Sequence, residues 1–411
     1  MKKIVFFEPE VKSGVGHHLD NLIQDAYFLK KNKKIIGVLN KEFKKKNLFV
    51  PKFIELIPTI TTLNNNLIIN IKYFFYFVKK IIFFLYYFKK QNKLFIFLKA
   101  CILNYFSIPT YFFSFYEKFK QINLNEKDHL LIQSCRPKDI ELIFFLCTLE
   151  TNIPNIHIKL HYPPKKKKLK NFFSYANRIV KLRNTINKFF IYSSFINIKN
   201  IIESDKKLTC EISTPIYDSY NRKIIISNSN KEFTLGFLGA SRNEKGFNKL
   251  PDLLTEIYKK KNNFKFIIQL SNTVYPETEK TRKLIIDLAK NNKKIIIHHG
   301  YLDFLNWRKL LKKIDIMPII YNKSYTDSVA SGLFYSCVSN EIPMVIPKKT
   351  LYMKNLLFFK GFLEAEKINE YAEQLYKIYY NYKYYLKEMK KESRNYKILL
   401  KQDPLLNRIN K

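Results

Sequence analysis

Short apolar runs alternate with amphipathic stretches along most of this chain. The runs at 4–7, 35–39, 130–133 and 156–160 have the length of buried strands, and apolar residues at helical spacing lie between them, for example over 137–149. Runs of four to eight apolar residues are typical of strands, and a 3.6-residue period is typical of a helix. Regular alternation of the two predicts a parallel sheet covered by helices.

The clearest alternation spans residues 235–347. Polar turns follow its apolar strands at 239–246, 299–300 and 326–332. In an open α/β sheet, ligands bind at the carboxyl ends of strands, where helix N-termini present N–H groups to phosphates. The first turn carries Arg242 and Lys245, and two cations beside a helix N-terminus are suited to a diphosphate. Solvated charges in a surface loop are the alternative interpretation.

Residues 67–120 interrupt the alternation with aromatic and aliphatic runs. Lysine pairs at 79–80 and 89–90 divide these runs, and none reaches the roughly 18–20 apolar residues of a membrane span. On a helical wheel the lysines occupy one half and aromatic residues dominate the other, as in a helix lying in a membrane interface. We expect an insertion that contacts an anionic membrane peripherally. A helix packed on the core, from a Phe-rich composition, is the alternative.

The charge balance also indicates an anionic partner. The 411 residues include 73 Lys and Arg against 34 Asp and Glu, a formal net charge of +39. Nucleic acid, a membrane surface or a phosphorylated substrate would each fit this charge. Abundant Lys, Asn, Ile, Phe and Tyr beside scarce Gly and Ala would also result from an AT-rich genome. No helix-turn-helix, zinc or RNA-binding motif is recognisable, so no specific nucleic acid is expected.

Cysteine usage and the first residues favour a cytoplasmic location. The five cysteines include no C-x-x-C pair, so neither a zinc site nor a disulfide framework is indicated. The apolar run at 4–7 is too short for a signal peptide. No Asp-x-Asp motif occurs, and no metal ion or other cofactor is expected.

The order of these motifs resembles that of GT-B glycosyltransferases of the retaining family 4. The resemblance is carried by segments 14–19, 237–246, 300–318 and 331–345. It implies an α/β fold with two Rossmann-like domains, whose parallel sheets face each other across a cleft. It also implies transfer of a sugar, with retention, from a nucleotide diphosphate sugar to a lipid-linked or cell-envelope saccharide. A cytoplasmic enzyme of polysaccharide biosynthesis, at the cytoplasmic face of the inner membrane, would fit.

The resemblance also implies a domain organisation. Residues 1–218 would form the acceptor-side domain with the insertion 67–120, and the polar stretch 219–232 would be the linker. Residues 233–363 would bind the nucleotide sugar. Residues 364–411 would form a C-terminal helix that crosses back to the first domain, and the apolar spacing over 368–389 predicts one long amphipathic helix.

Site residues follow from the same resemblance. The donor diphosphate is assigned to Gly239, Arg242, Lys245, Ser331 and Gly332. The nucleotide and its sugar are assigned to His299, Gly300, Tyr301, Ser328 and Ser336. The acceptor-side loop is assigned to Gly14, Gly16 and His18, and the catalytic roles to His161 and His17. For His161, a capping or buried histidine is the alternative.

One departure from the family bears on activity. The family often carries two Glu residues eight positions apart near the donor, and Ser328 and Ser336 stand at those positions. The chain would then contact its donor differently or would lack catalysis. A non-catalytic GT-B partner protein and a basic nucleic-acid-binding protein are therefore the alternative functions.

Overall fold

A computed structural model represents the whole chain in two compact units, Met1–Ser213 with Arg408–Lys411 and Thr214–Asn407. The structure describes residues 1–8, 11, 17–29, 33–40, 42–43, 50–60, 115, 118–133, 135–150, 152–160, 166–182, 187–217, 232–259, 264–272, 274–322, 331–348, 350 and 360–411. Nearly all of the predicted insertion 67–120 and of the linker 219–232 lies outside these residues.

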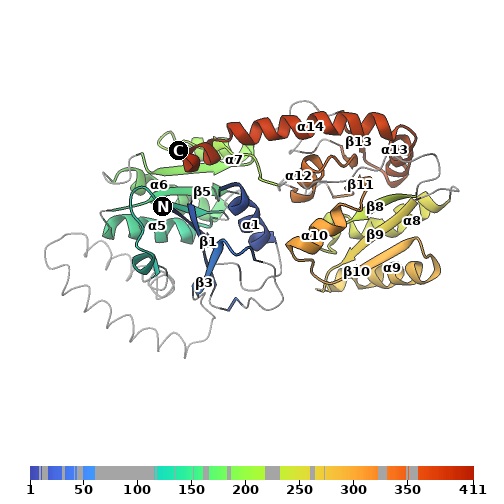
Figure 1. The fold of residues 1–411 in the computed structure, drawn as a ribbon, viewed down its shortest axis with the longest axis horizontal. Helices are drawn as coiled ribbons and strands as arrows, with labels where there is room; N and C mark the ends of the chain where they lie inside the picture. Colours follow the sequence, from blue (N-terminus) through green and yellow to red (C-terminus); the bar gives the residue numbers. More distant parts are fainter. Residues whose placement is uncertain are drawn as a thin grey trace. The chain divides into compact units, whose positions relative to one another are not determined.

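The first unit is a parallel sheet with helices on it (blue to green in Figure 1). Its strands are β1 (Lys2–Glu8), β2 (Lys33–Asn40), β3 (Ile54–Ile60), β4 (His129–Ile132), β5 (Asn155–Leu160), β6 (Phe189–Ser193) and β7 (Glu211–Ile212). Their order is β3-β2-β1-β4-β5-β6-β7, and every pair runs parallel. The helices are α1 (His17–Leu29), α5 (Pro137–Leu149), α6 (Lys166–Val180) and α7 (Ile196–Glu203).

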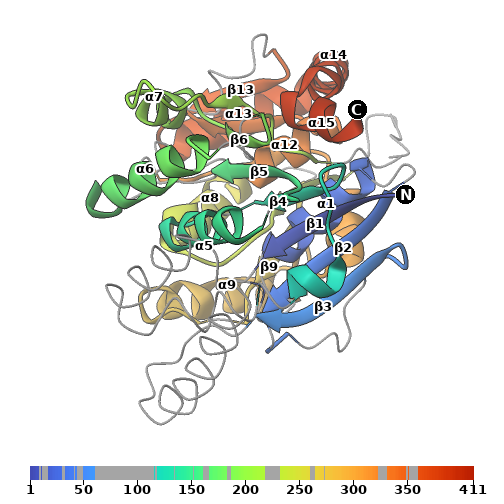
Figure 2. The same ribbon diagram turned by 90° about the vertical axis from the view of Figure 1, so that its left-hand side faces the viewer.

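Local sequence explains these elements. The strands are buried almost throughout, which is why they read as continuous apolar runs rather than alternating ones. Helix α5 begins at Pro137, where Asp139 accepts a hydrogen bond from the Arg136 backbone N–H at 2.7 Å. Helices α5 and α6 lie side by side (Figure 2).

The second unit is built in the same way (yellow to red in Figure 1). Its strands are β8 (Phe233–Phe237), β9 (Phe264–Leu270), β10 (Ile295–His299), β11 (Met317–Pro318), β12 (Met344–Pro347) and β13 (Phe362–Ala365). The orders β10-β9-β8 and β11-β12-β13 are joined by a parallel bridge between Leu235 and Ile316. The α-helices are α8 (Leu250–Tyr258), α9 (Glu279–Asn291), α10 (Phe304–Leu311), α12 (Gly332–Ser339), α13 (Ile368–Tyr380) and α14 (Tyr382–Gln402), and α15 (Pro404–Asn410) ends beyond the unit.

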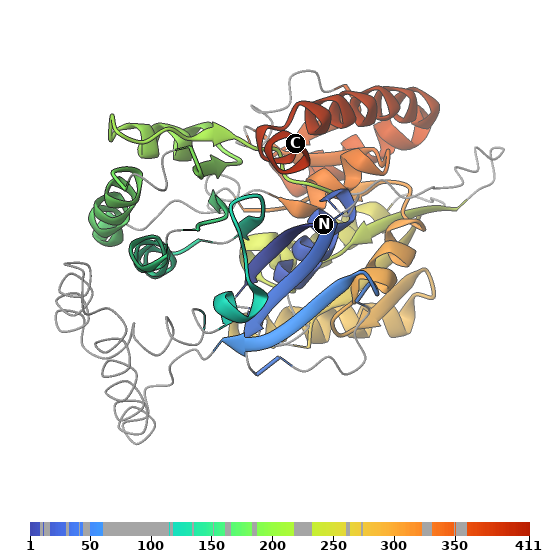
Figure 3. The same cartoon turned by 60° about the vertical axis from the view of Figure 1, so that its left-hand side comes forward.

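Short 3₁₀ turns connect some of these elements. They are η1 (Asn243–Lys245), η2 (Phe247–Lys249) and η3 (Pro276–Thr278). The core of the unit lies between β8, β9 and the packed pair α8 and α13. In the first unit, strands β1 to β3 lie side by side (blue in Figure 3). The predicted α/β class with Rossmann-like parallel sheets is confirmed in each unit.

The single helix predicted over 368–389 is wrong. Helix α13 ends at Tyr380, and Asn381 adopts φ −115° and ψ 31° before α14 begins. The Asn381 side-chain amide donates to the carbonyl of Lys377 at 3.1 Å, and such local bonds compete with the helical pattern.

Asp303 caps α10 by accepting from the Asn306 N–H at 2.7 Å.

Candidate functional site

The polar turns of the second unit meet at the carboxyl ends of β8, β9 and β10. The first turn leaves β8 at Gly239, which has φ +124°, a conformation that glycine adopts at little cost. A Cβ built on Gly239 would lie 3.7 Å from the Nζ of Lys245. The turn therefore brings the ammonium of Lys245 next to the bare backbone at the end of β8.

Gly246 fixes this turn against the strand beside it. Its φ is +77°, and a Cβ there would overlap the carbonyl oxygen of Ile320. Asn322 completes the attachment, because its side-chain amide donates to the Asn243 carbonyl at 2.7 Å and its N–H donates to the Glu244 carbonyl at 3.0 Å. The cationic turn is thus held rigidly between β8 and the chain that leaves β11.

Lys245 is an electrostatically strained cation. Burial and the nearby Arg242 guanidinium lower its pKa from the ordinary 10.5 to about 8, and Glu244 offsets part of this. Glu244 itself pairs with Arg242, with 3.0 Å between Nη1 and Oε1. A half-buried cation whose stronger ionic neighbour is another cation would be stabilised by an anion in the same space.

Gln269 joins two of the turns. It is the polar residue near the end of the apolar strand β9, and it is 5% exposed. Its Oε1 accepts from the Gly239 N–H at 2.9 Å, and its Nε2 donates to the Gly300 carbonyl at 3.0 Å. One side chain therefore sets the spacing between the turns after β8 and β10. Our sequence analysis missed this residue, although a Gln inside an apolar strand was a visible signal.

The N-terminus of α12 lies at the same edge. Ser331 caps the helix by accepting from the Phe334 N–H at 3.1 Å, and its Oγ lies 3.4 Å from the Tyr321 hydroxyl. Burial raises the pKa of Tyr321 to about 12, and Arg242 acts in the opposite direction. Tyr321 thus lies between the cationic turn and the helix N-terminus, where unpaired N–H groups favour anions.

Tyr217 covers the first residue of α12. A Cβ on Gly332 would clash with the Tyr217 hydroxyl, so only glycine leaves room for this ring. Tyr217 stacks on Tyr335 with 6.2 Å between ring centroids and 4° between planes. Its N–H donates to the Tyr396 hydroxyl of α14 at 2.9 Å. Tyr217 could not be predicted from local sequence, because the contact joins residues more than a hundred positions apart.

The other predicted residues are distributed as follows. Gly300, with φ +92°, and the partly exposed Tyr301 follow β10, whose last residue His299 is exposed. Ser336 is buried one turn inside α12. His17 and His18 begin α1, but nothing is described of their side chains. Gly14, Gly16, His161 and Ser328 lie outside the described residues.

The first unit has its own polar group at the carboxyl edge of its sheet. Glu8 ends β1, is buried, and accepts from the Gln133 N–H at 3.1 Å. Gln133 in turn donates to the buried carboxylate of Asp25. Burial raises the pKa of Glu8 to about 8, and Asp139 and Asp25 add to this while Arg136 opposes it. Glu8 is therefore largely protonated at neutral pH.

Among the described residues, no three His, Cys, Asp or Glu side chains gather closely enough to hold a metal ion. In that same part of the chain, no helix has the length and apolar character needed to cross a bilayer.

Three solved structures are similar to this chain over nearly its whole length. HepE from Anabaena, in complex with UDP and glucose, has a TM-score of 0.61 and 11% identity, covering 100% of this chain and 97% of its own. A glycosyltransferase from Rickettsia africae ESF-5 has a TM-score of 0.57 and 14% identity, covering 99% and 95%. Sucrose-phosphate synthase from Thermosynechococcus elongatus has a TM-score of 0.56 and 9% identity, covering 99% and 98%.

No protein-family model and no curated protein sequence match the chain. Identities of this size establish the fold alone. The fold is that of GT-B glycosyltransferases, with a Rossmann-like parallel sheet in each unit, as the motif order predicted.

Proposed function

We propose that this protein is a glycosyltransferase that uses a nucleotide diphosphate sugar as donor. The observation that carries the proposal is Lys245, a cation with a lowered pKa held beside Arg242 and the open backbone of Gly239. The fold it shares with HepE, a protein crystallised with UDP and glucose, supports a uridine nucleotide.

The chemistry required of the site is charge neutralisation. When the bond between the sugar and the donor diphosphate breaks, the leaving nucleotide diphosphate gains negative charge. Arg242 and Lys245 would stabilise that charge, with N–H groups from Gly332 at the start of α12 assisting. Cations fixed before the reaction do this without reorganisation. Gly300 and Tyr301, held through Gln269, would border the nucleotide.

The acceptor would be a lipid-linked or cell-envelope saccharide, with transfer retaining the configuration at the sugar carbon. This finer assignment rests on the resemblance to family 4. His161 and His17, on the acceptor side, would contact the reacting sugar or the acceptor hydroxyl, and Gly14, Gly16 and His18 would form the acceptor loop. A cytoplasmic enzyme at the inner face of the membrane fits such an acceptor.

Donor binding provides the first test. Calorimetric titration with UDP and a panel of UDP-sugars is expected to show binding to the wild-type chain. Lys245→Ala is expected to lower turnover by roughly 10²–10³-fold, the scale for loss of one preorganised electrostatic contact. A folded wild-type protein that binds none of these nucleotides would exclude the proposal.

A non-catalytic role in complex with another transferase is the second candidate. It is favoured by Ser336, which stands buried in α12 where the family often places a carboxylate. Such a protein would bind UDP but would release none from a UDP-sugar, with or without saccharide acceptors. Turnover by the isolated chain would exclude it.

Peripheral membrane contact is a separate proposal based on the sequence of residues 67–120. Near an anionic surface each lysine contributes on the order of 1 kcal/mol. Changing Lys79, Lys80, Lys89 and Lys90 to Gln is expected to release the chain from acidic liposomes at moderate salt, with UDP affinity unchanged. A wild-type chain that ignores acidic liposomes at low salt would rule this contact out.

A further inference from the structure

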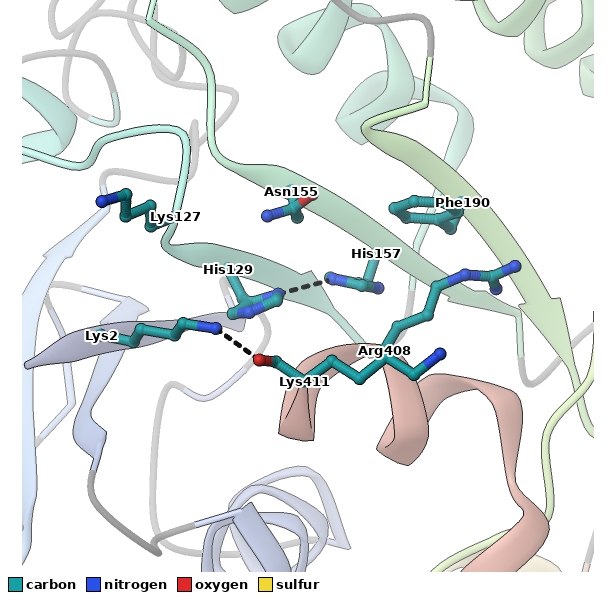
Figure 4. A pocket seen from close by; sticks show the side chains of 8 residues that line it. All are labelled: Lys2, Lys127, His129, Asn155, His157, Phe190, Arg408 and Lys411. Atoms are coloured by element: carbon teal, nitrogen blue, oxygen red, sulfur yellow. Dashed lines mark hydrogen bonds between the residues drawn. The ribbon is translucent and has the colours of Figure 1, made fainter.

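A cavity lined by several charged and polar side chains lies at the amino ends of the strands in the sheet of the first unit. It has a volume of about 570 Å³. Figure 4 shows Lys2 from β1, Lys127 from the turn before β4, and Lys411 after α15 around it, with His129 and His157 between them. Nothing in the proposed transferase reaction uses this cavity, because donors and acceptors in this fold bind at carboxyl ends of strands.

A chain of buried hydrogen bonds forms one wall. Arg408 donates to the Tyr192 hydroxyl at 3.1 Å, that hydroxyl lies 3.1 Å from Nδ1 of His157, and Nε2 of His157 lies 3.0 Å from Nδ1 of His129. Arg408 also forms a bidentate pair with Glu211 and covers the Phe190 ring at 4.4 Å. The wall is therefore rigid, and the guanidinium is already neutralised by Glu211.

The donor and acceptor roles along these hydrogen bonds favour an N–H donor on His129, at the end of the series. Arg408 can only donate, so the Tyr192 hydroxyl accepts from it and can pass its own proton toward His157. His157 then donates through Nε2 to Nδ1 of His129, which leaves the His129 proton on Nε2. That nitrogen is buried, has no hydrogen-bond partner among the residues that the structure describes, and belongs to a side chain that lines the cavity. An unpartnered buried N–H indicates a missing acceptor.

The positive charges around His129 also favour an anionic acceptor in the cavity. Lys2 and Lys33 add to burial in lowering the pKa of His129 to about 4, so the ring is neutral at pH 7. Burial, and after it Lys2, lowers the pKa of Lys33. The Lys2 ammonium already donates to the main-chain oxygen of Lys411 at 2.8 Å, which leaves two of its three N–H groups for a ligand. Asp128 accepts from the backbone N–H groups of Lys3 at 2.7 Å and Asn125 at 2.9 Å.

The geometry points to a binding site for a small phosphorylated molecule in this cavity, with the phosphate held by Lys2, Lys127, Lys411 and the Nε2–H of His129. Lysines are point-charge donors, and several of them with one N–H suit the oxygens of a phosphate group. Among the described residues that line the cavity, the guanidinium that could bind a planar carboxylate with two N–H groups is that of Arg408, and it is bound to Glu211. The cavity is larger than one phosphate, so the ligand carries a further group.

Inorganic pyrophosphate is a suitable probe if binding is followed by the NMR signals of residues that line this cavity. In the full chain labelled at its seven histidines, the ring resonances of His129 and His157 are expected to shift saturably on titration at physiological salt. Pyrophosphate bound at Lys245 in the other unit would leave those signals unchanged. Vesicles with and without phosphatidic acid form a second arm, and a shift with these vesicles alone would identify a lipid headgroup as the source of the phosphate.

A matched pair of variants assigns the binding. Lys2→Gln with Lys127→Gln is expected to weaken the pyrophosphate response by about tenfold or more, as for lost charge-assisted hydrogen bonds. Lys170→Gln with Lys207→Gln removes the same charge at exposed positions of that unit and is expected to change it less than about twofold. UDP affinity should be equal in both, which separates this site from the proposed donor site. Unmoved histidine signals in both arms, or equal weakening by both variant pairs, would overturn the inference.

Discussion

Replacing Lys245 by methionine is expected to stabilise the folded chain while weakening UDP binding. Protonated Lys245 is disfavoured in the folded protein, where its pKa is about 8 rather than 10.5. At about 1.4 kcal/mol per pH unit, that difference corresponds to about 3 kcal/mol at neutral pH. Because the side chain is only partly buried, we expect a gain of roughly 1–3 kcal/mol in the free energy of unfolding.

The pH dependence of this gain has a definite sign. Between pH 8 and 10.5 the unfolded chain holds the Lys245 proton and the folded chain does not, so wild-type stability rises with pH in that window. The advantage of Lys245→Met should therefore be full below pH 8 and disappear by about pH 10.5. Urea unfolding at several pH values measures it, and Lys312→Met, at an exposed position of the same unit, is the matched control.

UDP binding provides the second readout of the same variant. Losing a charge-assisted contact to phosphate should weaken UDP affinity by roughly tenfold or more. Wild-type affinity should fall as pH rises above 8, since the unprotonated amine no longer attracts the diphosphate. A less stable Lys245→Met protein would refute the electrostatic argument. A more stable one that binds UDP normally would refute the placement of the diphosphate.

Three further changes test other parts of the fold. Gln269→Leu leaves the Gly239 N–H and the Gly300 carbonyl without their partner, and should lower the free energy of unfolding in urea by roughly 2–4 kcal/mol. A decrease below about 1 kcal/mol would contradict the bridging role. Gly246→Ala should destabilise by more than about 3 kcal/mol, because φ +77° and a backbone clash act together. Gly239→Ala should cost less, because its Cβ would meet the Lys245 Nζ at 3.7 Å and no backbone atom. Glu8→Gln should be more stable than the wild type by a few kcal/mol at pH 9 but by little at pH 4.5. The wild type loses stability as the pH rises from 4.5 through the folded-state pKa of about 8, and glutamine has no proton to lose. Parallel profiles of unfolding free energy against pH would show that Glu8 is not buried as an acid.

Local signals account for what the sequence predicted well. Strand–helix alternation and the turn after β8 depend on residues within one βα unit, so the fold class and the cationic turn of Arg242 and Lys245 were visible in the chain itself. The roles of Gln269, Tyr217 and the pair of His129 and His157 were not, although a Gln inside an apolar strand was a visible signal. Their roles come from contacts across 28 or more positions, which only packing reveals. The helix break at Asn381 was not predicted because the apolar spacing of the helix continues through it.

The lysines behind the excess of positive charge fall into two groups, those exposed on the surface and those held close to other cations. An exposed lysine changes stability very little, so a biased genome can accumulate lysines on a surface without consequence for folding. The same bias does not explain cations placed where they cost stability. Burial and Arg242 lower the pKa of Lys245, and burial and Lys2 lower the pKa values of Lys33 and His129. A bound anion would relieve this repulsion, which makes these two positions, rather than the net charge of +39, the argument for phosphate ligands.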